Sequence, residues 1–364
     1  MPARPAVLRR GRARVADRRR PAGRLPLRRG EPGRPDGRRA GAVAVSGAPV
    51  RIGVDLGQGG CRAVAHHDGR TGHARTPGFW SGQPAARIAD AVGAALADLG
   101  PAPDGPVAVG VGMTGLNGRT PSTDDLRSRL RDRGLRGTLH VADDSVTAYL
   151  GALGPVPGAV VAAGTGVVVL AAAPDGRTAR VDGWGAALGD RGSGHWIGRA
   201  ALRRALRQRD RDRAGPLLDA AVATFGPLET LPARWREQPP TPEQLAGFAG
   251  AVAELARAGD PDARSVWRRA GVLLADSAVA ALRRTGLAGA DVPVAGTGGV
   301  FAAADLLLPT FTRALRVGAP YARPVTATAD PLAGALALCA RPTGGTLFTG
   351  LVVHCDIEER AGKR

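Results

Sequence analysis

The chain has 364 residues, a length that favours about two domains, and 44% of them are hydrophobic, enough to bury a sizeable core. No apolar run approaches the roughly 18 residues of a membrane-spanning helix, so we expect no membrane partner. The three cysteines, Cys61, Cys339 and Cys355, lie far apart and form no CxxC pair. This spacing argues against a disulfide framework or a cysteine metal site, and it favours a cytoplasmic location.

The N-terminal segment carries most of the charge. The net charge is +18, and residues 1–49 contribute +11 of it through 14 arginines against three acidic residues. Residues 1–48 are rich in Arg, Pro, Gly and Ala without apolar periodicity, so we expect a disordered basic tail. They contain no compact apolar stretch typical of a signal peptide. A polyanion-binding arm and a dispensable extension both fit this composition; we favour the extension and expect no nucleic-acid partner.

A glycine turn between two apolar strands follows directly, in the sequence VRIGVDLGQGGCRAV (residues 50–64). The pattern returns 107 residues later in AVVAAGTGVVVLAAAPDGRT, and both copies reach a DGRT sequence that suits a type I′ hairpin turn. Each copy therefore predicts a three-stranded antiparallel meander. Two unrelated hairpins would have to match four spacings by chance. Neither turn is a Rossmann fingerprint or a P-loop, because β-branched residues resume directly after both turns and the only lysine is Lys363.

Helices and strands alternate after each meander. In the first half we expect helices at 83–100 and 123–134, strands at 106–113 and 138–143, and a helix over 145–153. In the second half we expect helices near 194–208, 215–225, 242–258, 262–285, 301–315 and 331–340, and a strand at 292–296. The predicted fold class is α/β, with two domains that each contain a mixed sheet flanked by helices and that face each other across a ligand-binding cleft. The expected boundaries are 49–154 and 155–342, followed by a C-terminal tail at 343–364.

The two glycine turns are candidate phosphate sites. Backbone N–H groups of a tight glycine turn converge on a concavity that suits anions. One turn in each domain could therefore hold the phosphates of a nucleoside triphosphate. Asp55 precedes the first turn, where a carboxylate could hold Mg²⁺ beside the phosphates, whereas its equivalent in the copy is Ala162. A hydrogen bond from Asp55 to its own turn is an equally good interpretation.

Three further segments carry candidate site residues. Asp143-Asp144-Ser145 lies between a strand and a helix, where one aspartate can cap the helix while the other accepts a proton from a substrate hydroxyl. The segment 183–198 is dense in Gly, Trp and Asp, which suits a carbohydrate site, although Trp196 is better explained as core and His195 as a packing or surface residue. The segment 294–301 is a strand, a glycine turn and a helix start, compatible with adenine binding or with a simple turn.

Together these segments resemble the N-acetylglucosamine kinase and BadF/BadG/BcrA/BcrD ATPase family, within the superfamily of actin-like ATPases, sugar kinases and Hsp70 ATPases. The resemblance covers roughly residues 50–341. Its most specific part is GWGAALGDRGSGHWIG joined to the upstream GTG turn, which is similar to the family's GTGS, GGWG and GDEGSAYWIG sequences. The resemblance implies two RNase H-like domains, each with a mixed five-stranded sheet flanked by helices. It also implies ATP and Mg²⁺ as cofactors, a sugar substrate and a homodimer.

The resemblance also implies a role for each candidate residue. Asp144 is the expected general base and Asp55 the expected metal ligand. Phosphate contacts are expected from Gly57, Gln58 and Gly59 in the first turn and from Gly164, Thr165 and Gly166 in the second. The sugar contacts are expected from Asp144, Thr165, Trp184, Gly185 and Asp190, and the adenosine contacts from Gly298 and Gly299.

The chain departs from the family pattern in several places. Gly59 and Gly60 replace the Thr/Lys-type residues of the first turn, Val167 replaces the Ser after GTG, and Arg191 replaces the Glu after Gly-Asp. Residues 79–83 read FWSGQ where amino-sugar kinases tend to carry Asn. The resemblance therefore implies an ATP-dependent kinase of N-acetylglucosamine or a related amino sugar. The alternatives are a BadF-type ATPase that activates a partner enzyme, for which the scattered cysteines offer no cluster ligands, and a catalytically weakened sugar sensor.

Overall fold

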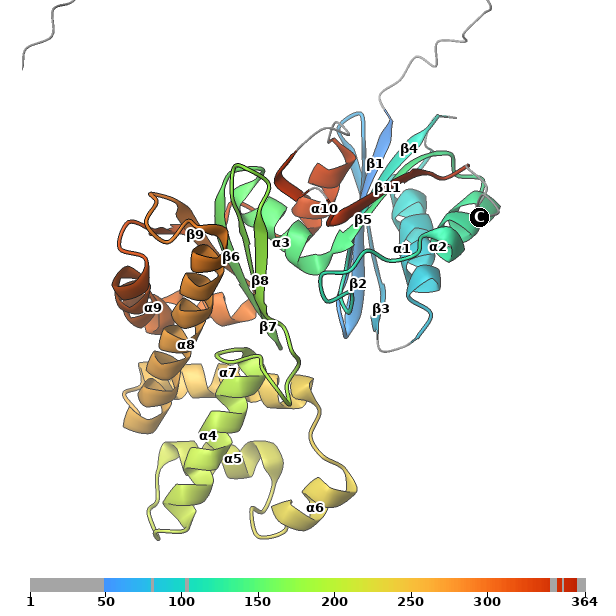
Figure 1. Ribbon diagram of the computed structural model, residues 1–364. Coiled ribbons are helices and arrows are strands. Elements are labelled where there is room, and N and C mark those ends of the chain that lie inside the picture. Colours follow the sequence, from blue (N-terminus) through green and yellow to red (C-terminus); the bar gives the residue numbers. More distant parts are fainter. Residues whose placement is uncertain (1–48, 80–81, 102–104, 341–345, 349, 359–364) are drawn as a thin grey trace, which may run out of the picture. The chain divides into compact units, whose positions relative to one another are not determined.

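A computed structural model of the protein describes residues 49–79, 82–101, 105–340, 346–348 and 350–358. The expected basic tail, Trp80 and Ser81 lie outside these residues. The described residues build two mixed β-sheets with helices packed on them (Figure 1). Among these residues no helix is both long and apolar enough to cross a membrane.

The first sheet has six strands in the order β11-β5-β4-β1-β2-β3. The meander β1 to β3 is antiparallel, β4 and β5 continue the sheet parallel to β1, and β11 closes the edge antiparallel to β5. The strands are β1 (Val50–Leu56), β2 (Gly60–His67), β3 (Arg70–Pro77), β4 (Val107–Met113), β5 (Gly137–Asp143) and β11 (Val352–Asp356).

The second sheet repeats this plan with five strands in the order β10-β9-β6-β7-β8. Its meander is again antiparallel, and β9 runs parallel to β6 as β4 does to β1. The strands are β6 (Gly158–Ala163), β7 (Val167–Ala172), β8 (Thr178–Asp182), β9 (Pro293–Thr297) and β10 (Arg323–Thr326). The duplication inferred from the sequence is therefore present in the topology.

Two helices connect the sheets through direct packing. Helix α3 contacts β6, β7 and β9, helix α10 contacts β1 and β4, and the two helices pack against each other. Their approach is close because Gly334 has no side chain; a Cβ there would lie 1.8 Å from the Thr147 carbonyl oxygen. The helices are α1 (Pro84–Leu99), α2 (Asp124–Asp132), α3 (Asp144–Leu153), α4 (Gly194–Arg209), α5 (Pro216–Phe225), α6 (Leu231–Glu237), α7 (Pro242–Arg257), α8 (Pro261–Thr285), η2 (Gly299–Ala303), α9 (Ala304–Gly318), α10 (Pro331–Cys339) and η3 (Thr346–Phe348).

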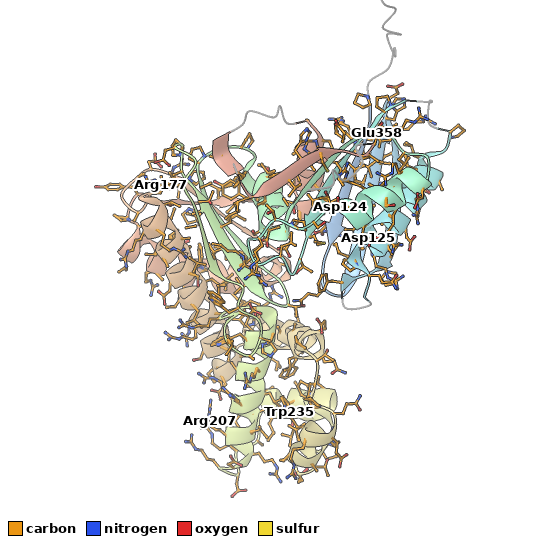
Figure 2. All side chains as sticks on the ribbon, turned by 45° about the vertical axis from the view of Figure 1, so that its right-hand side comes forward. Asp124, Asp125, Arg177, Arg207, Trp235 and Glu358 are labelled. Carbon is orange, nitrogen blue, oxygen red and sulfur yellow. The ribbon has the colours of Figure 1, made fainter. Side chains whose placement is uncertain are left out.

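The C-terminal segment differs from the expected tail at 343–364. Residues 352–356 form β11, so the first sheet has six strands rather than the expected five. Ile357 is fully buried in the core of this sheet, and Phe348 is buried against Tyr149 of α3. Glu358, which Figure 2 labels, accepts a hydrogen bond from the Gly137 N–H at 3.0 Å. The described residues of this segment, 346–348 and 350–358, therefore belong to the packed fold.

The two DGRT sequences form different turns. In the first copy Asp68 and Gly69 both have positive φ and His67 pairs directly with Arg70, which is the expected two-residue type I′ turn. In the second copy only Gly176 has positive φ, and the Ala173 N–H donates to the Arg177 carbonyl around a longer loop. The prediction of a type I′ turn is thus confirmed in the first copy and wrong in the second.

Candidate functional site

The carboxyl ends of β1, β4 and β5 lie side by side in the first sheet. Leu56 is paired with Met113, and Met113 is paired with Asp143, so the three parallel strands end in register. Because parallel strands present their carboxyl ends at one edge, the residues around these positions gather there. This edge holds Asp55 of β1, Thr114 directly after β4, and Asp143 with Asp144 after β5.

The two adjacent aspartates have different structural roles. Asp143 is the N-cap of α3, and its carboxylate accepts hydrogen bonds from the N–H of Ser145 at 3.1 Å and of Gly118 at 3.0 Å. Asp144 is the first residue of α3 and its side chain is hydrogen-bonded to Thr114. The structure therefore uses Asp143 as the cap and leaves Asp144 for another role.

The pKa of Asp144 is raised to about 7. Burial is the largest cause, followed by the charge of Asp143; the hydrogen bond to Thr114 opposes the shift, and the charge of Asp55 adds to it. A carboxylate with a pKa near the working pH combines a useful ionised fraction with enough basicity to take a proton. Asp144 has the properties of a general base at neutral pH.

Asp55, the expected metal ligand, is held in an ion pair. Arg62 lies opposite it on β2, and the Arg62 Nη2 to Asp55 Oδ2 distance is 2.7 Å. The Arg62 Nη1 also contacts Asp330 Oδ2 at 3.1 Å. The Asp55 side chain is only 15% exposed. A carboxylate at this place is chemically suited to Mg²⁺, which prefers oxygen ligands, but such a metal would share Asp55 with Arg62.

The first glycine turn joins β1 to β2 and is open to solvent. The Gly57 N–H donates to the Gly60 carbonyl, and the Phe79 N–H donates to the Gly57 carbonyl, both at 2.9 Å. Gln58 and Gly59 are exposed, and a Cβ added at Gly59 would meet no atom within 4 Å. An anion could therefore approach the backbone of this turn, although one of the three expected N–H groups, that of Gly57, already has a partner.

The second glycine turn lines a pocket of about 500 Å³. Gly164, Thr165 and Gly299, three of the predicted nucleotide contacts, lie in its wall together with the face of α7 that carries Gly247 and Gly250. This volume is within the range of typical small-molecule sites, and the small α7 residues leave room for a flat ring. The pocket thus unites predicted phosphate and adenosine residues that are more than 130 positions apart in sequence.

Three other predicted residues have structural partners. The Asp190 carboxylate is buried against Gly166 and accepts a hydrogen bond from the Val167 N–H at 3.3 Å. Asp190 therefore ties the loop before α4 to the second turn. Gly298 has φ 92°, and a Cβ there would lie 2.4 Å from the Ala163 carbonyl oxygen, so glycine is needed for backbone packing. Gly166 is similarly crowded by Asp190.

Trp184 and Gly185 lie on the loop between β8 and α4. The Trp184 residue is 73% exposed, and Gly185 has φ 83°. An exposed indole can stack on a sugar ring, so its place is compatible with the predicted role. His195 is buried and its backbone N–H donates to the Thr165 carbonyl, so of the packing and surface roles expected for it the structure shows packing. Trp196 packs on the core of this half, as expected.

Sequence reasoning missed Thr114, Arg62 and Asp330. Thr114 directly follows a buried strand, which is the same signal that identified Asp144. Arg62 faces Asp55 only because the four-residue turn sets the register of β2. Asp330 is distant in sequence and reaches Arg62 from the N-terminus of α10.

The duplicated sheet topology and the paired glycine turns define the actin-like ATPase class of α/β proteins. The model of the BadF/BadG/BcrA/BcrD ATPase family matches residues 52–339, and the chain belongs to this family.

Individual relatives agree with this assignment. The chain is 26% identical over 232 residues to an N-acetylmuramic acid/N-acetylglucosamine kinase of Clostridium acetobutylicum, covering 63% of this chain and 76% of that protein. A crystal structure from Chromobacterium violaceum, provisionally described as an N-acetylglucosamine kinase, is 30% identical with a TM-score of 0.61, covering 80% of this chain and 99% of the other. A ROK family glucokinase of Streptomyces griseus, solved with glucose and AMPPNP, shares the fold at 19% identity with a TM-score of 0.51, covering 80% of this chain and 98% of the other.

Proposed function

We propose that the protein is an ATP-dependent sugar kinase that phosphorylates a hydroxyl of N-acetylglucosamine or a related amino sugar. The observation that carries the proposal is the half-buried Asp144 carboxylate at the carboxyl edge of the first sheet, hydrogen-bonded to Thr114 and with its pKa raised to about 7. The family assignment supports ATP use, and the relatives described as N-acetylglucosamine kinases support the sugar class.

In the proposed reaction Asp144 accepts the proton of the sugar hydroxyl. The hydroxyl oxygen forms a bond to the γ-phosphorus of ATP, and the bond between that phosphorus and ADP breaks. The adenosine occupies the pocket lined by Gly299 and α7, and backbone N–H groups of the two glycine turns bind the phosphates. Asp55 would hold Mg²⁺, which neutralises charge on the phosphate oxygens when bound. Trp184 and Thr165 are the proposed sugar contacts, and Asp190 acts by shaping the second turn.

We further propose that the catalytic unit consists of two domains, residues 49–154 and 155–342, extended by β11. The homodimer expected from the family and a cytoplasmic location stay predictions.

The proposal is tested by measuring ADP release with ATP, MgCl₂ and a panel of sugars that includes N-acetylglucosamine, N-acetylmuramic acid, N-acetylmannosamine, glucosamine and glucose. We expect release stimulated at least tenfold by an N-acetylated sugar and much less by glucose. A panel with no stimulating sugar contradicts the proposal.

A further inference from the structure

The Arg62 guanidinium lies between two carboxylates at the candidate site. Its Nη2 is 2.7 Å from Asp55 Oδ2, and its Nη1 is 3.1 Å from Asp330 Oδ2. The strand register places Arg62 directly opposite Asp55, and β2 begins only two residues earlier, at the end of the first glycine turn. The position of Arg62 relative to the turn is therefore fixed by the backbone.

Asp330 has two roles in this arrangement. Its Oδ1 accepts a hydrogen bond from the Ala333 N–H and caps α10, while its Oδ2 contacts Arg62. Helix α10 is packed tightly on β1, because a Cβ at Gly53 would lie 2.8 Å from the Leu336 side chain. A rigid helix terminus thus holds the second end of the guanidinium.

The repeat of the fold lacks both members of the Asp55–Arg62 pair. In the second meander the corresponding paired positions are Ala162 and Val168, which are both apolar. The first turn itself carries no basic side chain, because residues 57–60 read GQGG. Arg62 therefore supplies a positive charge that the first turn itself does not carry.

A guanidinium carries five N–H donors, and the bonds to Asp55 and Asp330 use two of them. The Arg62 side chain is 39% exposed, so it is accessible to a ligand at the turn. Guanidinium groups match the geometry of phosphate oxygens and bind them with charge-assisted hydrogen bonds. We propose that Arg62 is a phosphate-binding residue that contacts the γ-phosphate of the nucleotide, and that Asp330 is its positioning residue.

This inference rests on the proposed function, and its test separates the two. Dissociation constants for ADP and for AMPPNP, each with MgCl₂, are measured by calorimetry for the parent protein and for Arg62→Met, Arg62→Lys and Asp330→Asn. Asparagine keeps the α10 cap, because it is as good an N-cap as aspartate. Arg129→Met is the matched control. The Arg129 side chain is 37% exposed, and its Nε lies 2.9 Å from Oδ1 of Asp125, a residue of α2 that is labelled in Figure 2.

We expect Arg62→Met to weaken AMPPNP binding by about tenfold or more, because a charge-assisted hydrogen bond is lost, and ADP binding by much less. Arg62→Lys should recover part of this loss, Asp330→Asn should give a smaller loss of the same kind, and Arg129→Met should change neither constant. Circular dichroism melting curves identify any variant that fails to fold, in which case Arg62→Lys and Asp330→Asn decide the question.

A dissociation constant for AMPPNP that is unchanged in Arg62→Met overturns the inference. So does an Arg62→Met variant that needs less Mg²⁺ and turns over as fast as the parent protein, because Arg62 would then only compete with the metal for Asp55. A parent protein that binds neither nucleotide contradicts the proposed function instead.

Discussion

Asp143 and Asp144 are neighbours with the same side chain, yet the backbone gives them different chemistry. Asp143 ends β5 with an extended conformation that turns its carboxylate toward the free N–H groups of α3. Asp144 has already entered the helix, and its half-buried carboxyl group lies next to that of Asp143. Desolvation of the carboxyl group raises the pKa of Asp144 most, and the nearby charge of Asp143 raises it further.

Replacing Asp144 by Asn should lower kcat by about 10²- to 10⁴-fold, because an amide cannot accept the hydroxyl proton. In the parent protein kcat should fall as the pH drops below about 7, where Asp144 becomes protonated. Steady-state kinetics between pH 5.5 and 9 checks both expectations. A variant as active as the parent would exclude Asp144 as the base.

The same substitution should stabilise the fold at high pH. A carboxyl group whose folded pKa is raised contributes stability at low pH and loses it as the pH rises from its unfolded value near 4 to about 7. Asp144→Asn should therefore leave the free energy of unfolding little changed near pH 4 and raise it by about 1–2 kcal/mol at pH 8. Urea titrations at both pH values measure this. The control Asp125→Asn removes a carboxylate that is 65% exposed and should show no such pH dependence.

Gly59 is a second residue with a direct test. Its backbone does not have the positive φ that requires glycine, and a Cβ there would meet no atom within 4 Å, so a threonine fits without strain. Gly59→Thr should lower the KM for ATP by roughly two- to tenfold, because its hydroxyl adds a hydrogen-bond donor to the turn. The control Gly289→Thr fills an equally open glycine position remote from the turn. A KM for ATP that Gly59→Thr leaves unchanged would show that phosphate does not lie beside this turn.

At the scale of elements, β11 extends the first sheet beyond the residues that the family model matches. It pairs with β5, the strand that ends at Asp143 directly before Asp144, and Ile357 buries its side chain completely in the core of the same sheet. Ile357→Ala should reduce the free energy of unfolding by about 2–4 kcal/mol through the cavity that it creates. Chemical denaturation measures this loss, and Val317→Ala, at a residue that is 85% exposed, is the control. Equal stability of the two variants would mean that β11 does not dock in solution.

Most elements could be predicted because their apolar periodicity is long. Helices α1, α7 and α8 repeat apolar residues over at least 16 positions, and the boundaries observed lie within one or two residues of those predicted. Short segments gave no such signal: β10 has four residues and β11 has five, with His354 and Asp356 at exposed positions. Their strand pairing is decided by partners distant in sequence, which periodicity cannot reveal.

The candidate site was predictable where a chemical group follows directly from a strand or turn. Asp144, Thr165 and Gly299 were found in this way, and the last two line one pocket. The partners that tune the site were not predictable. The hydrogen bond of Thr114 to Asp144 and the position of Arg62 beside Asp55 depend on strand register, and the hydrogen bond from the Val167 N–H to Asp190 joins residues 23 positions apart.

At the scale of the whole molecule, duplication and divergence explain the chemistry that we propose. Both halves retain a glycine turn between antiparallel strands. The first half has Asp55 near the end of β1 and Asp143 at the end of β5, whereas the second half has Ala162 at the place of Asp55. The second retains a small-residue pocket next to its turn. In the proposed reaction one copy serves proton transfer and metal binding, and the other copy holds the nucleotide.

The most direct test of the kinase proposal is the stoichiometry of sugar phosphate to ADP. The purified full-length protein is incubated with ATP, MgCl₂ and the best sugar of the panel; ³¹P NMR then quantifies both products. We predict one sugar phosphate for every ADP formed, with no phosphate ester in Asp144→Asn. ADP and inorganic phosphate in equal amounts, without a sugar phosphate, would contradict the account and favour an ATPase that acts on a partner enzyme.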